Sequence, residues 1–260
     1  MSEGFFIYNG VSSLDLGITV VGTGTYPVPA RNLIFESVPG RSGDLIVDQG
    51  NYPNVRITYH CTCLTGLSAA LDSLAALLMA QTTYQRLEDS YHTDIYRMAI
   101  CDATLSPEVF SPDHGQGYKG GNFDITFNCR PQKWLKSGET PRRYSATGSS
   151  ALTLENPTPF SAAPLLHFGA GDTGEFEIYN WDTRSDVRIF LNAYSENEDR
   201  YVDCETQDVY GSNGANLNST VTFSNGRFPM LRPGRSSIYT FTWSSSGDGY
   251  YEITPRWWKL

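Results

Sequence analysis

One segment of this chain has the periodicity of an α-helix, and it stands alone among segments that alternate as β-strands do. Within residues 66–81, leucines recur at positions 67, 71, 74 and 78, which places them along one stripe of a helix. The segment is rich in Ala and Leu, both strong helix formers, and Ser68 is placed to cap its start. A lone amphipathic helix needs an apolar partner, so we predict that it packs on the face of a β-sheet.

The strand signals lie on both sides of this helix. The clearest is 55–63, where Val, Ile, Tyr and two Cys share one face while Arg, Thr and His share the other. The alternation at 14–18 predicts that the first strand continues there. The other strands that we predict in this half are 5–8, 33–38, 45–47, 84–89, 95–100 and 123–129.

A change in composition marks a domain boundary. Residues 130–149 hold two Pro, two Gly and several Ser but few apolar residues. We therefore predict one domain at 1–135 and a second at 136–260. The second half carries only strand signals, at 151–155, 163–168, 175–180, 186–194, 201–207, 219–223, 237–243 and 250–257. Short strands with turns every 8–12 residues or so are typical of a β-sandwich or jelly roll.

Charge and cysteine content narrow the function classes. The net charge is −9 and is spread over both halves, so the chain repels phosphate backbones and sequence-specific nucleic-acid binding is not expected. A surface past which DNA slides without sticking remains compatible with this charge. The five cysteines are odd in number and lack CxxC spacing, which indicates buried, reduced thiols. With no basic leader and no apolar run long enough to cross a bilayer, we expect a soluble, unsecreted protein.

The turn-rich stretch from Pro39 to Asp44 raises the question of phosphate binding. A Walker loop requires GxxxxGK[ST] followed by a helix. Here the glycine spacing differs, Lys is absent, β-formers follow, and Asp44 would repel the phosphate. Pro and Gly in this pattern predict a hairpin turn instead.

Two other clusters could carry chemistry. Asp89, His92 and Asp94 include metal-ligand types, but polar turns have the same composition. Glu175 and Glu177 share one face of a strand, as paired catalytic carboxylates can, although exposed glutamates on a solvated sheet are commoner. We predict no catalytic residue, no cofactor and no metal.

Several stretches in order along the chain resemble the distal tail proteins (Dit) of long-tailed siphophages. Each motif alone is weak, but their order and spacing together are specific and cover nearly the whole sequence. The stretches are 5–18, 38–54, 86–97, 203–210, 228–234 and 255–257.

The resemblance implies a mainly β fold in two domains. The first would be a ring-forming β-sandwich with one helix and a protruding hairpin, and the second a galectin-like β-sandwich (jelly roll), whose last strand can return to the first domain. The protein would be a non-enzymatic virion component, made in the host cytoplasm. Six copies would form a baseplate ring that joins the tail tube to the tail-tip hub, anchors adsorption proteins and surrounds the DNA ejection channel.

Residue roles follow from the resemblance as expectations. Asp44 and Asp48 would face the channel and repel DNA. Arg41, Tyr52, Arg86 and Tyr91 would make ring or hairpin contacts. The galectin sugar signature is missing, because Trp181 is followed by Asp-Thr-Arg and no HxNPR occurs. Two alternatives stay open: a lectin-like module that binds cell-wall saccharide, and an enzyme that degrades the wall.

Overall fold

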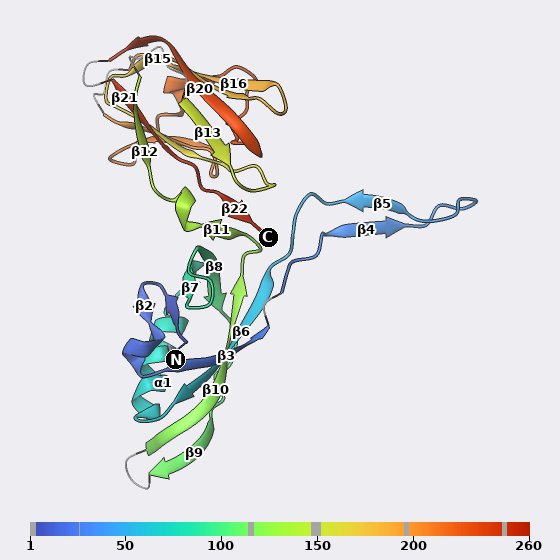
Figure 1. Cartoon of the computed structure of the whole chain (residues 1–260), viewed down its shortest axis with the longest axis vertical. Coiled ribbons are helices and arrows are strands. Elements are labelled where there is room, and N and C mark those ends of the chain that lie inside the picture. The colour runs from blue at the N-terminus through green and yellow to red at the C-terminus, as the bar shows by residue number, and fades with distance from the viewer. Residues whose placement is uncertain (1–3, 26, 114–116, 147–151, 195–197, 246–248) are drawn as a thin grey trace. The chain divides into compact units, whose positions relative to one another are not determined.

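The chain forms two compact units, each with its own hydrophobic core (Figure 1). Unit 1 comprises residues 1–133 with Leu260, and unit 2 comprises residues 134–259. The computed structural model describes residues 4–25, 27–113, 117–146, 152–194, 198–245 and 249–260.

Unit 1 is built on one curved antiparallel sheet with strand order β2-β1-β7-β8-β10-β6-β3, and β9 pairs with the far end of β10. Strand β6 alternates between buried and exposed residues along its whole length, as its sequence predicts. The strands are β1 (Phe6–Tyr8), β2 (Val11–Ser12), β3 (Thr19–Thr25), β6 (Val55–Cys63), β7 (Gln85–Asp89), β8 (Ile95–Cys101), β9 (Glu108–Asp113) and β10 (Gly117–Cys129).

Helix α1 (Leu67–Met79) covers the apolar face of this sheet, which confirms the packing predicted from the leucine stripe. Leu67, Leu74 and Leu78 are fully buried, and Leu71 packs against the core from its edge. Beneath the helix, Phe6, Tyr8, Tyr59 and Phe127 form an aromatic cluster with ring centroids 5.0–6.0 Å apart. The predicted cap is wrong: Gly66, at φ 70°, precedes the helix without a side-chain hydrogen bond, and Ser68 lies inside the first turn.

The predicted strand at 14–18 is also wrong. Residues Ser13–Leu16 form a short 3-10 helix, η1. The Ser12 side chain accepts a hydrogen bond from Leu14 N at its start, and Gly17 ends it in the left-handed conformation, φ 70°. Alternating leucines fit this tight turn as well as a strand, so periodicity alone misassigned them.

A separate two-stranded hairpin leaves unit 1 between β3 and β6, and we call it the arm. It consists of β4 (Leu33–Glu36), β5 (Leu45–Asp48) and the turn at 37–44. In Figure 1 the arm extends away from the sheet of unit 1. None of its residues belongs to the hydrophobic core of that unit.

Unit 2 is a sandwich of two five-stranded antiparallel sheets, with orders β12-β21-β14-β17-β18 and β13-β20-β15-β16-β19. Their inward side chains form a single core. The strands are β12 (Arg142–Ser145), β13 (Leu152–Asn156), β14 (Leu165–Phe168), β15 (Thr173–Asn180), β16 (Ser185–Leu191), β17 (Arg200–Asp203), β18 (Asp208–Gly211), β19 (Val221–Phe223), β20 (Gly234–Ser244) and β21 (Tyr250–Thr254). The short elements η2 (Lys136–Gly138) and η3 (Asn218–Thr220) complete it, and the paired strands β11 (Lys133–Leu135) and β22 (Trp258–Lys259) lie at its two chain ends.

Two strand predictions in unit 2 need correction. The strand expected at 201–207 ends at Asp203, whose carboxylate accepts hydrogen bonds from the backbone N–H groups of Glu205 and Thr206. This Asx turn, with Gln207 at φ 58°, reverses the chain into β18. Strand β12 lies inside the stretch that composition marks as a linker. It is an exposed edge strand, so it lacks the apolar alternation of a central strand.

All five cysteines are unpaired and buried, as their spacing predicts. Burial raises the pKa of Cys61 and of Cys129 to about 12.

Among the described residues, no helix combines the length and the apolar character that a membrane crossing requires.

Candidate functional site

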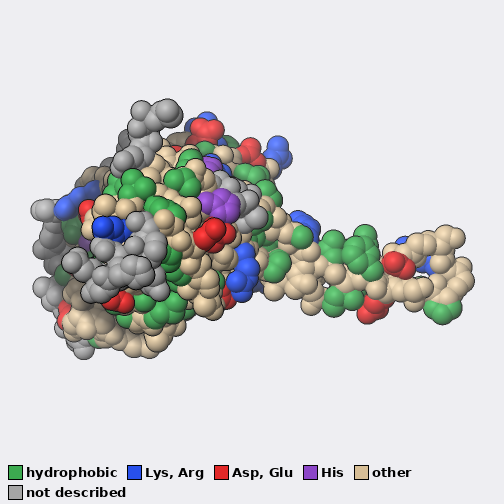
Figure 2. All heavy atoms as spheres, turned by 90° about the horizontal axis from the view of Figure 1, so that it is seen from below, with side chains coloured by type: hydrophobic (Ala, Val, Ile, Leu, Met, Phe, Trp, Pro, Cys, Tyr) green, Lys and Arg blue, Asp and Glu red, His purple; other side chains and the backbone are tan. Residues whose placement is uncertain are grey.

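The arm is the most unusual surface of unit 1, because it exposes apolar side chains on both of its faces. Phe35 and Ile46 are cross-strand partners on one face and are 59% and 60% exposed. Ile34 lies on the opposite face and is 46% exposed, and Leu45, on the same face as Ile34, is 42% exposed. Figure 2 shows these hydrophobic side chains and the acidic residues beside them along the arm. A two-stranded hairpin is marginally stable alone, and one with two apolar faces needs cover from elsewhere.

The predicted channel residues Asp44 and Asp48 both lie exposed on this arm. Asp48 Oδ2 accepts a hydrogen bond from Arg31 Nη1 at 2.7 Å, and its Oδ1 accepts one from the Gly50 N–H. Tyr52 lies against the same guanidinium. Its hydrogen bond and charge interaction, together with the charge of Asp48, raise the pKa of Arg31 above its ordinary value. The structure thus brings Asp48 and Tyr52 together at the base of the arm.

The turn of the arm holds Arg41, whose N–H donates to the Val38 carbonyl. Gly40 and Gly43 have φ of 81° and 82°, so they supply the backbone freedom that the turn requires. The stretch continues into β5 rather than into a helix. This geometry is that of a hairpin turn and not of a phosphate loop.

The predicted contact residues Arg86 and Tyr91 belong to a different hairpin, formed by β7 and β8. Arg86 Nε lies 2.5 Å from Glu88 Oε1, and its guanidinium lies 4.0 Å from the centroid of the Tyr96 ring. Tyr91, in the turn, is 47% exposed. Of these two predicted contact residues, Tyr91 is therefore the more exposed.

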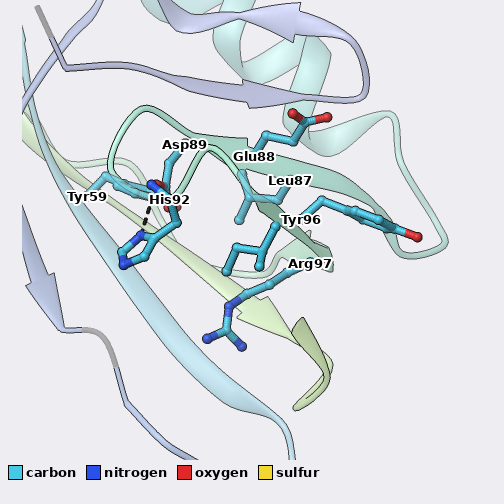
Figure 3. Close-up of a pocket in the computed structure, with 8 residues that line it drawn as sticks. Tyr59, Leu87, Glu88, Asp89, His92, Tyr96 and Arg97 are labelled. Carbon is cyan, nitrogen blue, oxygen red and sulfur yellow. Dashed lines mark hydrogen bonds and ion pairs between the residues drawn. The ribbon is translucent and has the colours of Figure 1, made fainter. Parts of the chain in front are cut away.

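Asp89 organises the turn of this second hairpin (Figure 3). One carboxylate oxygen accepts from the Tyr59 hydroxyl at 2.9 Å, and the other accepts from the backbone N–H groups of Tyr91 and His92. The His92 ring nitrogen Nδ1 lies 3.2 Å from the same oxygen. These contacts use the Asp89 carboxylate as a turn organiser. In the described part of the chain, no three His, Cys, Asp or Glu side chains are arranged to hold a metal ion.

A small cavity beside Asp89 is too small for an organic ligand. Its volume is about 10 Å³, which is about the minimum that one water molecule requires. Tyr59, Leu87, Tyr96 and Arg97 line it (Figure 3). The inside of this hairpin is therefore filled by its own side chains and leaves no room for a substrate.

The sheet face opposite α1 forms a polar ladder between β6 and β10. His60 Nδ1 lies 2.6 Å from Asp124 Oδ1, and the hydroxyls of Thr58 and Thr126 are 2.9 Å apart. Further along, Arg56 makes a two-pronged contact with Asp102, at 2.8 and 3.1 Å. The ladder residues are Arg56, Thr58, His60 and Thr62 on β6 with Asn122, Asp124, Thr126 and Asn128 on β10. None of these eight side chains is apolar, and the charges of Arg56 and Asp124 are paired with neighbouring groups.

The carboxylates of Glu175 and Glu177 converge on one cation. Arg188 Nη1 lies 3.6 Å from Glu175 Oε2, and its Nη2 lies 3.5 Å from Glu177 Oε2. Burial raises the pKa of Glu177, and the charge of Arg188 opposes that rise. The two acids share a guanidinium on a sheet face instead of facing each other across a cleft, which disfavours a role in glycoside hydrolysis.

Together, the two units define a class of fold. The fold is a β-unit with one helix and a projecting hairpin, followed along the chain by a two-sheet β-sandwich. The solved structure of the SPP1 Dit protein (gp 19.1) shares it over the full length: the TM-score is 0.71 and each chain is covered to 100%, at 13% sequence identity. That protein is described as "a Paradigm of Hub Adsorption Apparatus in Gram-positive Infecting Phages". No protein-family model and no curated protein sequence matches this chain.

Sequence reasoning located the hairpin of the arm but missed its apolar residues as a functional surface. The sequence did contain a signal for this surface, because apolar residues occupy both odd and even positions within 33–36 and 45–47. In a strand that packs on one core, apolar residues occupy alternate positions only. Apolar residues at odd and even positions therefore indicated a hairpin with apolar side chains on both faces.

Proposed function

We propose that this chain is a structural protein of a long-tailed phage virion, and that six copies form the ring that joins the tail tube to the tail-tip hub. The observation that carries the proposal is the fold similarity to SPP1 Dit, which extends over all of both chains. A match over both units and the arm is harder to obtain by chance than a match to one β-sandwich.

The arm supports self-association. Its two exposed apolar faces need a partner, and the partner that we propose is a second copy of the same chain. A contact between one patch and a different patch on the next copy closes into a ring when the rotation between copies fits. The proposed contact residues are Arg41 on the arm, Tyr52 at its base, and Arg86 and Tyr91 on the second hairpin.

The polar ladder of β6 and β10 supports a DNA channel. A channel wall should not bind the phosphate backbone, and a ladder of polar side chains whose charges are paired has that property. The net charge of −9 per copy adds a general repulsion. In this proposal Asp44 and Asp48 also face the channel, and acidic residues outnumber basic ones on its wall.

The remaining parts of the proposal concern location and partners. The protein would be made in the host cytoplasm and reside at the virion tail tip. There it would contact the tail tube protein, a tail-tip hub protein and the receptor-binding or baseplate proteins that it anchors. Its role would be mechanical and not enzymatic.

Solution mass and particle images test the ring. Native mass spectrometry of the purified chain over a range of concentrations should show a hexamer, and electron micrographs should show a ring with a central hole. A chain that stays monomeric at every concentration, and also when mixed with its tail tube protein, would exclude the ring.

A double substitution tests the channel residues. Asp44→Lys with Asp48→Lys should slow DNA ejection from assembled virions, and unchanged ejection kinetics would show that these residues do not face the channel.

A further inference from the structure

Unit 2 holds an exposed tryptophan in a fixed orientation. Trp181 follows β15 directly and is 48% exposed, although its indole N–H donates to Ser237 Oγ at 2.8 Å. Its backbone N–H donates to the Arg235 carbonyl at 3.0 Å. A half-exposed indole is commonly mobile, but these two bonds anchor this one to β20.

The turn that carries Trp181 is built to hold it there. The side chain of buried Asn180 accepts from the Thr183 N–H and hydroxyl, and its amide donates across to the backbone of β20. Asp182 Oδ2 accepts from the Arg235 N–H at 3.1 Å. Gly234 is required for this approach, because a Cβ there would lie 1.8 Å from Asp182 Oδ2. The ring is therefore preorganised at the cost of a constrained backbone.

Polar and aromatic groups surround the indole on the outer face of the sheet. The Tyr179 ring meets it edge to face at 5.0 Å, and the Arg235 guanidinium lies 5.7 Å from its ring centroid. Glu155 is the cross-strand partner of Arg235, and both side chains are exposed. We call the surface formed by Tyr179, Trp181, Asp182, Arg235 and Glu155 the strip. It combines aromatic rings, a hydrogen-bond donor and carboxylate acceptors.

The chemistry of this strip selects its occupant. An apolar peptide would cover the indole but would strip water from Arg235, Asp182 and Glu155 without replacing their hydrogen bonds. A pyranose sugar does both tasks, because its C–H face covers an aromatic ring while its hydroxyls donate to carboxylates and accept from a guanidinium.

Charge restricts the sugar further. Acidic side chains exceed basic ones on the outer faces of β13, β15 and β16 and in the β15–β16 turn: Glu155, Glu175, Glu177, Asp182 and Asp186 against Arg184 and Arg188, with Arg235 on β20. An anionic polymer such as a phosphate-bearing glycan would be repelled. We propose that Trp181, Tyr179, Arg235 and Glu155 form a binding site for a neutral saccharide chain of the cell surface. This site does not depend on the missing galectin signature, nor on the ring proposed above.

A glycan array followed by calorimetry tests the site. The full chain, fluorescently labelled, is applied to immobilised neutral oligosaccharides (glucans, galactans, chitin and rhamnose-containing fragments) and to anionic ones (teichoic-acid and uronic-acid fragments). We expect retention on at least one neutral class and none on the anionic class. Titration of the best neutral oligosaccharide should show that Trp181→Ala weakens binding by about tenfold or more.

Matched variants separate a lost contact from a lost fold. Phe110→Ala removes an aromatic side chain of similar exposure from unit 1 and should leave the affinity unchanged. Trp181→Phe should restore part of the affinity because it keeps an aromatic ring. Retention of no neutral glycan, a preference for anionic glycans, or equal affinity of wild type and Trp181→Ala would each overturn the proposal. The hexamer mass is measured separately, so failure of the saccharide site would leave the ring proposal standing.

Discussion

Removing the apolar pair on one face of the arm should prevent ring assembly without unfolding the chain. Phe35 and Ile46 are 59% and 60% exposed in the single chain. Complete burial of such a side chain is worth about 1.5–3 kcal/mol, so the surface that is still exposed can contribute about 1–2 kcal/mol each. Phe35→Ser with Ile46→Ser should therefore cost about 2–4 kcal/mol per contact between copies. At 1.4 kcal/mol per factor of ten, this weakens each contact by about 30- to 700-fold.

Sedimentation velocity or native mass spectrometry would measure this effect. The wild-type chain should assemble at concentrations where the double variant remains monomeric. Thermal unfolding of the variant should match that of the wild type, because neither residue belongs to the core of unit 1. Phe241→Ser makes a comparable change on the outer face of unit 2, where Phe241 is 39% exposed, and should leave assembly intact.

Hexamers of the double variant with the same concentration dependence as the wild type would contradict a ring contact through the arm. Disruption of assembly to the same degree by Phe241→Ser would also contradict it, because the ring contact would then not be specific to the arm. A variant that aggregates or unfolds early would show that the arm supports unit 1 itself. That result would contradict the separation of the arm from the core.

Three further outcomes concern stability and reactivity. Arg200 is completely buried and donates to three backbone carbonyl groups of unit 2, so Arg200→Leu should lower the free energy of unfolding by about 3 kcal/mol or more in urea titrations; a loss under about 1 kcal/mol would contradict this. Cys61 and Cys129, whose pKa burial raises to about 12, should react with a disulfide reagent at pH 8 only after denaturation, and fast labelling of the native chain would refute their burial. Burial tends to raise the pKa of Asp203, but hydrogen bonds and charge from Arg256 hold that pKa below its ordinary value, so the pair stabilises the fold above about pH 4 and loses this contribution as the pH falls through the lower folded pKa. Asp203→Asn should flatten that acid limb of the stability–pH curve, and an unchanged limb would assign it to other carboxylates.

The sequence was most informative where one core sets the pattern. Strand β6 and helix α1 each bury one face, so periods of two and of 3.6 residues identified both. It was least informative where side-chain hydrogen bonds reverse the chain. The cap at Ser12 and the turn at Asp203 replaced expected strand residues, and both depend on contacts that periodicity does not encode.

The candidate surfaces were predicted only in part. Pro and Gly identified the arm turn, and with it Asp44 and Asp48, because turn chemistry is local. The exposure of Phe35 depends on whether other chain segments cover the hairpin, and no local pattern contains that information. Trp181 is a comparable case: its neighbours Arg235 and Glu155 come from distant strands, and only the cross-strand register of β13, β15 and β20 brings them together.

The pairing of β11 with β22 has a consequence for how such proteins can change. Unit 2 begins at β11 and ends at β22, which pair with each other, and the Leu135 N–H donates to the Trp257 carbonyl at 2.8 Å. A segment whose two ends lie side by side can be exchanged as a cassette, since removing or replacing it leaves a gap that a short linker closes. Residues 134–259 carry their own core, so recombination at this strand pair could replace the whole sandwich in one event while unit 1 and its arm stay as they are.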